Sequence, residues 1–207
     1  MSRQVIIIDY DIGNVASVQK AFTKLGVGVK ISSRIDDLET SDYIVLPGVG
    51  AFKDGMDNLK RLNLIEILRK RILVDKTPFL GICLGMQLLA KSSSEHGTHQ
   101  GLGWIDAQVE RLSENKNIRI PHIGWDDVEL RQSNDRLFSG VEDLCFYFVH
   151  SFVMKPHDPG IATSYCEYGE KFVSSIRQGN IFAIQFHPEK SQKSGLKLLD
   201  NFLNLGV

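Results

Sequence analysis

The segment from Gly81 to Gly85, with the sequence Gly-Ile-Cys-Leu-Gly, constrains the fold of this chain more than any other. It follows an apolar run at residues 77–80 and precedes a helical pattern at residues 86–91. A Gly-x-Cys-x-Gly sequence between a strand and a helix has the form of a nucleophile elbow, whose glycines make room for a tight turn. The following helix would direct its first free N–H groups toward the Cys83 sulfur and favour the reactive thiolate. The pattern therefore predicts a strand–turn–helix unit and indicates a cysteine enzyme.

The first half of the chain alternates short apolar runs with amphipathic stretches. Strands are predicted over residues 4–9, 27–32, 42–46 and 79–82, and helices over residues 15–25, 53–63, 64–74 and from 83 to about 91. Strands separated by helices form mainly parallel sheets that are covered on both faces. This half therefore predicts an α/β fold.

The second half of the chain has a different pattern, with short apolar runs separated by turns. Strands are predicted over residues 104–112, 127–130, 146–153, 161–168, 172–178 and 181–186, and an amphipathic helix over residues 191–205. This half is expected to be antiparallel or mixed. No repeat or linker divides the sequence, so we expect a single domain over residues 1–207.

Composition excludes several classes of function. The formal net charge of −1 gives no electrostatic reason to expect nucleic acid or an anionic membrane as a partner. No apolar run approaches the roughly 20 residues that span a bilayer, and the N-terminus lacks the features of a signal peptide. The three cysteines Cys83, Cys145 and Cys166 are widely spaced, which favours a reducing compartment over a disulfide framework or a zinc site. We expect a cytoplasmic protein without a metal.

Three predicted loops carry the residues with chemical potential. In open α/β sheets, functional sites form beyond the carboxyl ends of the strands. The loops at such ends contain Gly48-Val49-Gly50, the Cys83 elbow and His187-Pro188-Glu189. These loops are therefore the candidate site, although over a hundred residues separate Cys83 from His187.

A cysteine nucleophile needs a base, and the base benefits from a group that orients it. His187 is the candidate base, and Glu189 points to the same side if the chain is extended there. The tetrahedral oxyanion needs donors, which the N–H of Leu84 and the glycine-flanked Gly48–Gly50 segment can supply. Each motif alone also fits ordinary packing or an ordinary turn, and Cys145 and Cys166 lie in apolar contexts that predict core positions. The combination favours catalysis.

Together these motifs resemble those of the class I (triad-type) glutamine amidotransferases, in the same order along the chain. Within that family, the sequence is most similar to the glutaminase subunits of imidazole glycerol phosphate synthases. This finer resemblance rests on residues 9–14, 46–52, 101–103, 121–125 and 146–151, which are distributed over nearly the whole chain. It implies a flavodoxin-like, three-layer α/β fold with a mostly parallel central sheet and an additional antiparallel or mixed portion.

The resemblance also implies roles for individual residues. Cys83 would attack the side-chain amide of glutamine, His187 would transfer protons, and Glu189 would orient His187. The family's oxyanion hole corresponds to Gly48, Val49 and Gly50 together with Leu84. The positions near the bound glutamine correspond to Gln87, Glu95, Ser151 and Phe152. No cofactor is implied.

A partner is implied as well. In the family, ammonia passes to a separate (β/α)8-barrel cyclase subunit, in a heterodimer, where the nucleotide PRFAR becomes imidazole glycerol phosphate and AICAR. Asn14, Trp125 and Lys190 lie in motifs that the family places toward the cyclase. Glutaminase activity in the family is low until the cyclase binds its nucleotide, which is allostery between two sites.

Two positions depart from the family's pattern, and alternatives stay open. Asp11 stands where glycine is usual, and Asp126 stands where asparagine is common. Both belong to the expected docking face, so a paralogous role in supplying ammonia for amino sugars of surface polysaccharides remains an alternative. A cysteine hydrolase of similar fold would not be expected to carry the His187–Glu189 motif. A flavodoxin-like binding module would have no use for the triad, and motifs 121–125 and 146–151 argue against other amidotransferase acceptors.

Overall fold

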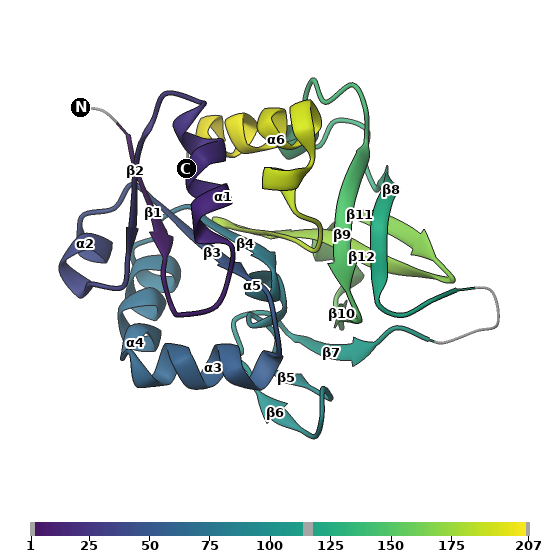
Figure 1. The fold of residues 1–207 in the computed structure, drawn as a ribbon, viewed down its shortest axis with the longest axis horizontal. Coiled ribbons are helices and arrows are strands. Elements are labelled where there is room, and N and C mark those ends of the chain that lie inside the picture. Colours follow the sequence, from purple (N-terminus) through teal and green to yellow (C-terminus); the bar gives the residue numbers. More distant parts are fainter. Residues whose placement is uncertain (1–2, 114–117, 206–207) are drawn as a thin grey trace.

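The computed structural model describes residues 3–113 and 118–205, and within them a nine-stranded sheet forms the centre of the molecule (Figure 1). The strand order is β2-β1-β3-β4-β13-β12-β11-β8-β9. These strands are β1 (Gln4–Ile8), β2 (Gly28–Ser32), β3 (Tyr43–Gly48), β4 (Phe79–Cys83), β8 (His122–Leu130), β9 (Cys145–His150), β11 (Ala162–Tyr168), β12 (Glu170–Gln178) and β13 (Ile181–Ile184).

The first five strands of this order run parallel, and the remaining ones pair antiparallel. Strand β4 lies between β3 and β13, with Gly48 opposite Cys83 and Ile184 opposite Ile82. The carboxyl ends of β3, β4 and β13 therefore lie level at one edge of the sheet, although they come from distant parts of the sequence. The predicted parallel first half and the antiparallel or mixed second half are both confirmed.

Helices cover both faces of the parallel part, which gives three layers (Figure 1). Helices α1 (Val15–Thr23) and α6 (Gln192–Asn204) pack on one face, while α3 (Phe52–Arg61), α4 (Leu64–Arg69) and a π-helical turn (Lys70–Val74) pack on the other. Alternate residues of β1 face opposite layers, so Val5 and Ile7 join the first core while Ile6 and Ile8 join the second. The short helix α2 (Ile35–Glu39) was not predicted.

A second, four-stranded sheet has the order β10-β7-β5-β6 in the described residues. The residues predicted as one strand over 146–153 form two strands, so that prediction was wrong: β9 ends at His150 and β10 (Phe152–Pro156) pairs with β7 (Ala107–Arg111). Strands β5 (Ser92–Ser93) and β6 (His99–Gln100) complete this sheet in the described residues. The chain changes sheets at Ser151, because β9 finds its partner in β8 while β10 finds its partner in β7. This change places Ser151 and Phe152 beside the carboxyl edge of the parallel strands.

The prediction of a helix from residue 83 to about residue 91 was also wrong. Helix α5 (Leu84–Gln87) is a single turn. The carbonyls of Leu88 and Ala90 accept hydrogen bonds from the backbone N–H groups of Leu102 and Gly103, at 2.8 and 3.0 Å. These tertiary bonds replace the next helical turn. The N–H groups of Trp104 and Ile105 bond the Leu89 carbonyl at 3.0 Å, so β7 begins at Ala107 and not at the predicted residue 104. Strand β8, by contrast, starts at His122, five residues before the predicted start at 127.

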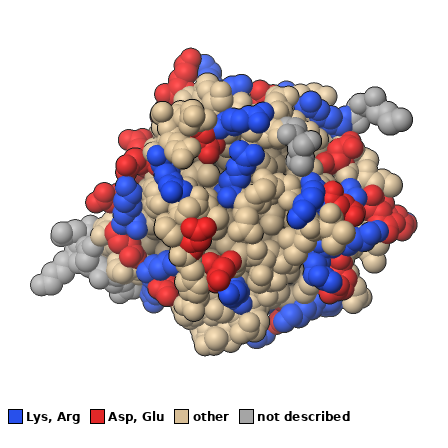
Figure 2. Space-filling model, turned by 180° about the vertical axis from the view of Figure 1, so that it is seen from behind, with Lys and Arg blue, Asp and Glu red and all other residues tan. Residues whose placement is uncertain are grey.

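The surface agrees with the near-neutral composition. Figure 2 shows both signs of charge intermixed on the face seen from behind, without a large region of one sign. Among residues 3–113 and 118–205, no helix has the length and apolar character that crossing a membrane requires.

Replacing Gly85 by Ala should destabilise the protein by at least about 3 kcal/mol. A Cβ atom at this position would lie 1.8 Å from the carbonyl oxygen of Leu46, so β3 and α5 would have to separate. The free energy of unfolding in denaturant measures the effect. The control is Gly179→Ala, where φ is 60° but nothing lies within 4 Å of the added atom, and which should cost only about 1 kcal/mol. Equal costs for the two variants would contradict the steric argument.

Candidate active site

Cys83 occupies a strained turn between β4 and α5. Its backbone has φ 54° and ψ −110°, a conformation that residues with a side chain rarely adopt. Two glycines permit the turn, because a Cβ at Gly81 would lie 2.8 Å from the carbonyl oxygen of Gly85, and one at Gly85 would strike Leu46. The glycines therefore make room for packed backbone on either side of Cys83. This geometry is the nucleophile elbow that the sequence predicts.

The positive charge near Cys83 comes mainly from a side chain and not from the dipole of helix α5. Helix α5 has a single turn, so few aligned peptide dipoles point at the sulfur. The nearest charged partner is His187, which follows β13, the neighbour of β4. The sheet thus joins two motifs that are separated by over a hundred residues.

His187 and Glu189 form a buried pair. His187 Nδ1 donates to Glu189 Oε1 at 2.8 Å, and the two side chains are 2% and 1% exposed. The contact forms within a short 3-10 turn (Pro188–Lys190), not in the extended chain assumed from the sequence. Nε2 of His187 is buried and makes no hydrogen bond of ordinary geometry with the described residues.

The electrostatic surroundings keep His187 charged. Burial alone would lower the pKa of this imidazole, but the charge of the Cys83 sulfur, and then Glu189, raise the pKa from 6.5 to about 10. At neutral pH the ring is therefore an imidazolium beside the sulfur. Its position is fixed by its own backbone N–H, which donates to the Tyr147 carbonyl at 2.9 Å, and by Ser191, whose hydroxyl donates to the His187 carbonyl at 2.6 Å.

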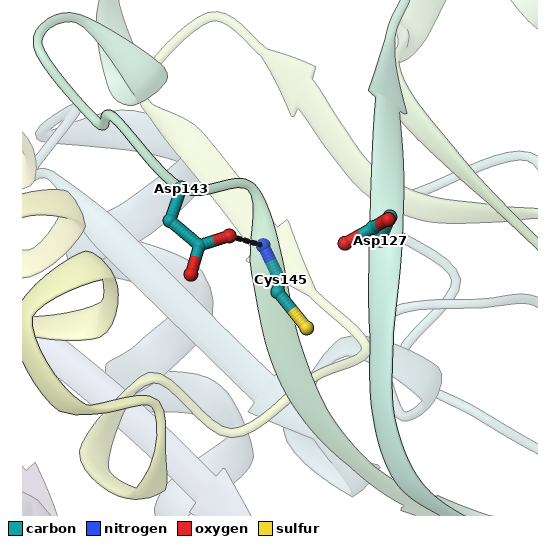
Figure 3. A group of neighbouring side chains, drawn as sticks. All are labelled: Asp127, Asp143 and Cys145. Atoms are coloured by element: carbon teal, nitrogen blue, oxygen red, sulfur yellow. Dashed lines mark hydrogen bonds between the residues drawn. The ribbon is translucent and has the colours of Figure 1, made fainter.

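The other two cysteines have surroundings that disfavour a thiolate. Burial raises the pKa of Cys166 to about 12, with Asp126 and Asp127 acting in the same direction. Burial also raises the pKa of Cys145, which is only partly buried and not in the core as expected. Figure 3 shows Cys145 between two carboxylates, with Asp143 accepting a hydrogen bond from its backbone N–H at 3.0 Å and Asp127 on the neighbouring strand. Of the three cysteines, Cys83 is the one that faces an imidazolium.

The Gly48–Gly50 segment lies directly against the elbow. A Cβ at Gly48 would lie 2.2 Å from the hydroxyl of Tyr10 and 2.9 Å from Cβ of Leu84. Only glycine fits at Gly48, and its backbone consequently approaches Leu84 closely. Burial and the charge of Cys83 raise the pKa of Tyr10, so its hydroxyl remains protonated beneath the segment. Tyr10 belongs to the motif at residues 9–14 that carries part of the resemblance, but the sequence analysis assigned it no role.

A pocket of about 450 Å³ opens above Cys83. It contains most of the residues that the sequence assigned to the oxyanion hole and to glutamine binding. Its lining comprises Val49, Gly50, Cys83, Leu84, Gln87, Glu95, Pro121, Val149, His150, Ser151, Phe152 and Lys190. Regions of the chain that are far apart in sequence therefore converge on one pocket.

The polar groups in the wall are already engaged. Gln87 Nε2 donates to the Phe152 carbonyl at 2.8 Å and to Gln185 Oε1 at 3.0 Å. Gln185 in turn directs its Nε2 toward Cys83 Sγ at 3.6 Å. The sequence analysis missed Gln185, although a polar residue that follows a buried strand two positions before His187 was a usable signal. Glu95 Oε2 accepts from the Phe52 N–H at 2.6 Å, at the start of α3.

The residues predicted to face a partner lie around this pocket and on the surface. Lys190 lines the pocket, and its Nζ lies 5.2 Å from the centre of the Tyr147 ring. Tyr147 contacts Trp125, which is 45% exposed, with the ring centres 5.9 Å apart. Asn14 caps α1 by accepting from the Ser17 N–H at 3.3 Å.

The two departures from the family pattern have local explanations. Asp11 has φ 63°, in the left-handed region where glycine is favoured and Asp is tolerated, and its carboxylate pairs with Arg61 of α3. Asp126 is turned inward and accepts from His122 Nε2 at 2.7 Å. Neither replacement disturbs the elbow.

Comparison with known proteins agrees with this geometry. The sequence matches the family of class-I glutamine amidotransferases over residues 6–205. The chain belongs to this family. It is therefore an amidotransferase enzyme, and the family predicted from the motifs is confirmed.

Individual relatives support the finer resemblance. The chain is 48% identical over 202 residues to "Imidazole glycerol phosphate synthase subunit HisH 1" of Campylobacter jejuni, covering 97% of this chain and 100% of that protein. It is 46% identical over 200 residues to the subunit HisH of Aquifex aeolicus, covering 96% and 95% of the two chains. Among solved structures, a chain of PurLQS from Thermotoga maritima superposes with a TM-score of 0.75 at 18% identity and 99% coverage of both chains, which supports the fold.

Replacing Glu189 by Gln should lower the pKa of His187 by at least about one unit, because the ring loses a carboxylate in direct contact. In the unaltered protein, the ring keeps its proton at neutral pH and loses it as the pH rises through about 10. NMR titration of the imidazole ring measures both values, with the exposed His157 as an internal reference. An unchanged titration in Glu189→Gln would mean that Glu189 does not hold the charge of His187.

Proposed function

We propose that this chain is the glutaminase subunit of an imidazole glycerol phosphate synthase, and that Cys83, His187 and Glu189 are its catalytic residues. The observation that carries the proposal is the level alignment of β3, β4 and β13, which brings a strained cysteine, a buried imidazolium and a glycine-rich segment to one pocket. The names of the relatives support the choice of synthase.

In the first half-reaction, the Cys83 thiolate attacks the side-chain amide carbon of glutamine. The oxyanion receives hydrogen bonds from the N–H of Leu84 and from the Gly48–Gly50 segment, which lies against Leu84. His187 gives its proton to the leaving nitrogen, so ammonia departs and a glutamyl thioester remains. The raised pKa of His187 ensures that this proton is present at neutral pH.

In the second half-reaction, the neutral His187 accepts a proton from water, and the hydroxide attacks the thioester carbon. The thiolate leaves, the new γ-carboxyl group of glutamate loses its proton to solvent, and the imidazolium is restored. Glu189 stabilises the imidazolium in both steps through its 2.8 Å hydrogen bond to Nδ1. Gln87, Glu95, Ser151 and Phe152 surround the space above Cys83 and are the proposed contacts of the glutamine.

The ammonia passes to a barrel-shaped cyclase subunit that docks over the pocket. Trp125, Tyr147 and Lys190 form a continuous set of contacts that leads from an exposed indole to the pocket mouth. Exposed Ile123 extends the apolar surface on the same face of β8 as Trp125. Asn14, which caps α1, belongs to this proposed interface as well.

Further parts of the proposal concern organisation and location. We propose that residues 1–207 form one amidotransferase domain, since both cores lie on the faces of one sheet; residues 1–2, 114–117 and 206–207 lie outside the described part. The biosynthetic role and the free cysteines fit a cytoplasmic protein.

Replacing Cys83 by Ala should reduce glutamine-dependent synthase activity by at least about 10³-fold, because the thioester cannot form. Cyclase activity driven by added ammonia should persist in the same complex. Cys145→Ala is the matched control and should retain activity, since carboxylates surround that thiol. Glutamate formation and nucleotide turnover are measured with the cyclase and PRFAR present. Full activity of Cys83→Ala would overturn the mechanism.

Replacing Trp125 by Ala should weaken binding of the cyclase by about tenfold or more, because aromatic anchors at interfaces carry a large share of the binding energy. The control is Val74→Ala, since Val74 is 68% exposed but ends the π-helical turn before β4, away from the pocket. Titration calorimetry with the purified cyclase measures the affinity of each variant. Equal affinities for the two variants would exclude Trp125 from the interface.

Identification of the natural partner tests the choice of pathway. Affinity capture with the intact chain should recover a barrel cyclase of histidine biosynthesis. Recovery of an amino-sugar enzyme in its place would favour the paralogous role and leave the glutaminase chemistry intact.

A further inference from the structure

A chain of hydrogen bonds runs from the surface to the wall of the glutamine pocket. Asp126 Oδ2 lies 2.7 Å from His122 Nε2, His122 Nδ1 lies 3.0 Å from His150 Nε2, and His150 Nδ1 lies 3.0 Å from the carbonyl oxygen of Phe152. His122 is fully buried and its ring is stacked between Phe148 and Tyr168, with ring centres 4.8 and 3.9 Å away. The ring therefore cannot turn to change its partners.

The number of protons in this chain follows from its two ends. The Phe152 carbonyl only accepts, so His150 Nδ1 carries a proton. If Asp126 is a carboxylate it also only accepts, so His122 Nε2 carries a proton. Two neutral histidines would then face each other with lone pairs at 3.0 Å, which is repulsive. The three hydrogen bonds therefore need three protons, with the additional positive charge balanced by Asp126.

An asparagine at position 126 would need no additional charge. Its amide N–H would donate to His122 Nε2, His122 Nδ1–H would donate to His150, and His150 Nδ1–H would donate to Phe152. All three bonds would form with neutral rings. The aspartate of this chain therefore makes the same geometry dependent on pH.

The far end of the chain supports the pocket. The Phe152 carbonyl accepts from His150 and also from Gln87 Nε2 at 2.8 Å, and Gln87 bonds Gln185, whose Nε2 lies 3.6 Å from Cys83 Sγ. His150 and Phe152 themselves line the pocket. Loss of the His122–His150 bond would free the His150 ring and loosen this wall.

We propose that Asp126 is a positioning residue: it holds a shared proton on His122 and His150, and this proton keeps His150 bonded to the Phe152 carbonyl in the wall of the glutamine pocket. The inference rests on the proposed function for its effect on glutamine, but its structural content concerns these side chains alone.

The charges around His122 and His150 set the pH at which the shared proton is lost. Burial, then His122, lower the pKa of His150 to about 3, with His187 acting in the same direction, so the two rings do not both carry a charge. Burial lowers the pKa of His122, while Asp126 opposes this shift. The other titratable groups around the chain are Tyr168, stacked on His122, and Cys166, Asp127 and Cys145, which neighbour Asp126. Because both pKa values lie below 6.5, the shared proton is present at acidic pH and is lost, with the central hydrogen bond, as the pH rises toward neutrality.

NMR of the imidazole nitrogens in the full chain tests the proton count directly. In the unaltered protein His122 Nε2 should be protonated, and one bridging proton should titrate as the pH rises from about 5 to 7. In Asp126→Asn, His122 Nε2 should be unprotonated and neither ring should titrate between about pH 5 and 7. The control is Asp127→Asn, since this exposed neighbour points to the other face of β8, and it should titrate like the unaltered protein. Identical ring signals in Asp126→Asn and Asp127→Asn would overturn the inference.

Kinetics of the complex with the cyclase test the consequence for glutamine. Between about pH 5 and 7, KM for glutamine of the unaltered complex should rise by about fivefold relative to Asp126→Asn, as expected for the loss of one buried hydrogen bond. Asp127→Asn should follow the unaltered complex. If the ratio of KM for glutamine between the unaltered complex and Asp126→Asn stays constant with pH, the positioning role is overturned. Absence of glutamine hydrolysis in every complex would refute the proposed function, whereas the ring titration would still decide the proton chain.

Discussion

The close approach of β3, β4 and α5 is the constraint on which the site depends. Packed atoms occupy the space that side chains at Gly48, Gly81 and Gly85 would need. This contact forces Cys83 into its strained conformation and sets the Gly48–Gly50 segment beside Leu84. The parallel pairing of β4 with β13 then fixes the place of His187. Sheet pairing thus positions the proposed nucleophile, oxyanion donors and base, which explains how distant motifs can form one rigid site.

Electrostatics select among groups that the sequence alone leaves equivalent. All three cysteines are free, but carboxylates adjoin Cys145 and Cys166, while an imidazolium adjoins Cys83. Because the interior screens charge weakly, the carboxylates disfavour a thiolate at Cys145 and Cys166, which leaves Cys83 as the proposed nucleophile. A single helical turn after the elbow suffices for this reason, because the positive charge comes from His187 in the turn after β13.

Local patterns predicted those parts of the fold that depend on local interactions. The apolar runs located the parallel strands, and the motifs at Gly81–Gly85 and His187–Glu189 marked the two loops that meet at the site. The misassigned elements have non-local causes: α5 ends because residues 102 and 103 bind its next carbonyls, and the chain changes sheets at Ser151 because the flanking strands have different partners. Gln185 and Tyr10 were missed because their contacts with the elbow exist only in the folded chain.

The two departures from the family pattern, Asp11 and Asp126, keep the local geometry and change the local charge. Asp11 keeps a left-handed backbone and gains an ion pair with Arg61, so its replacement of glycine conserves the conformation. Asp126 keeps the shape of asparagine but reverses the hydrogen-bonding role at one atom, from donor to acceptor. Since its partner His122 cannot turn, the three hydrogen bonds then require one additional proton on the His122–His150 pair. A one-atom difference at the surface thereby alters the charge of a buried network, and through His150 and Phe152 it reaches the pocket in which glutamine would bind.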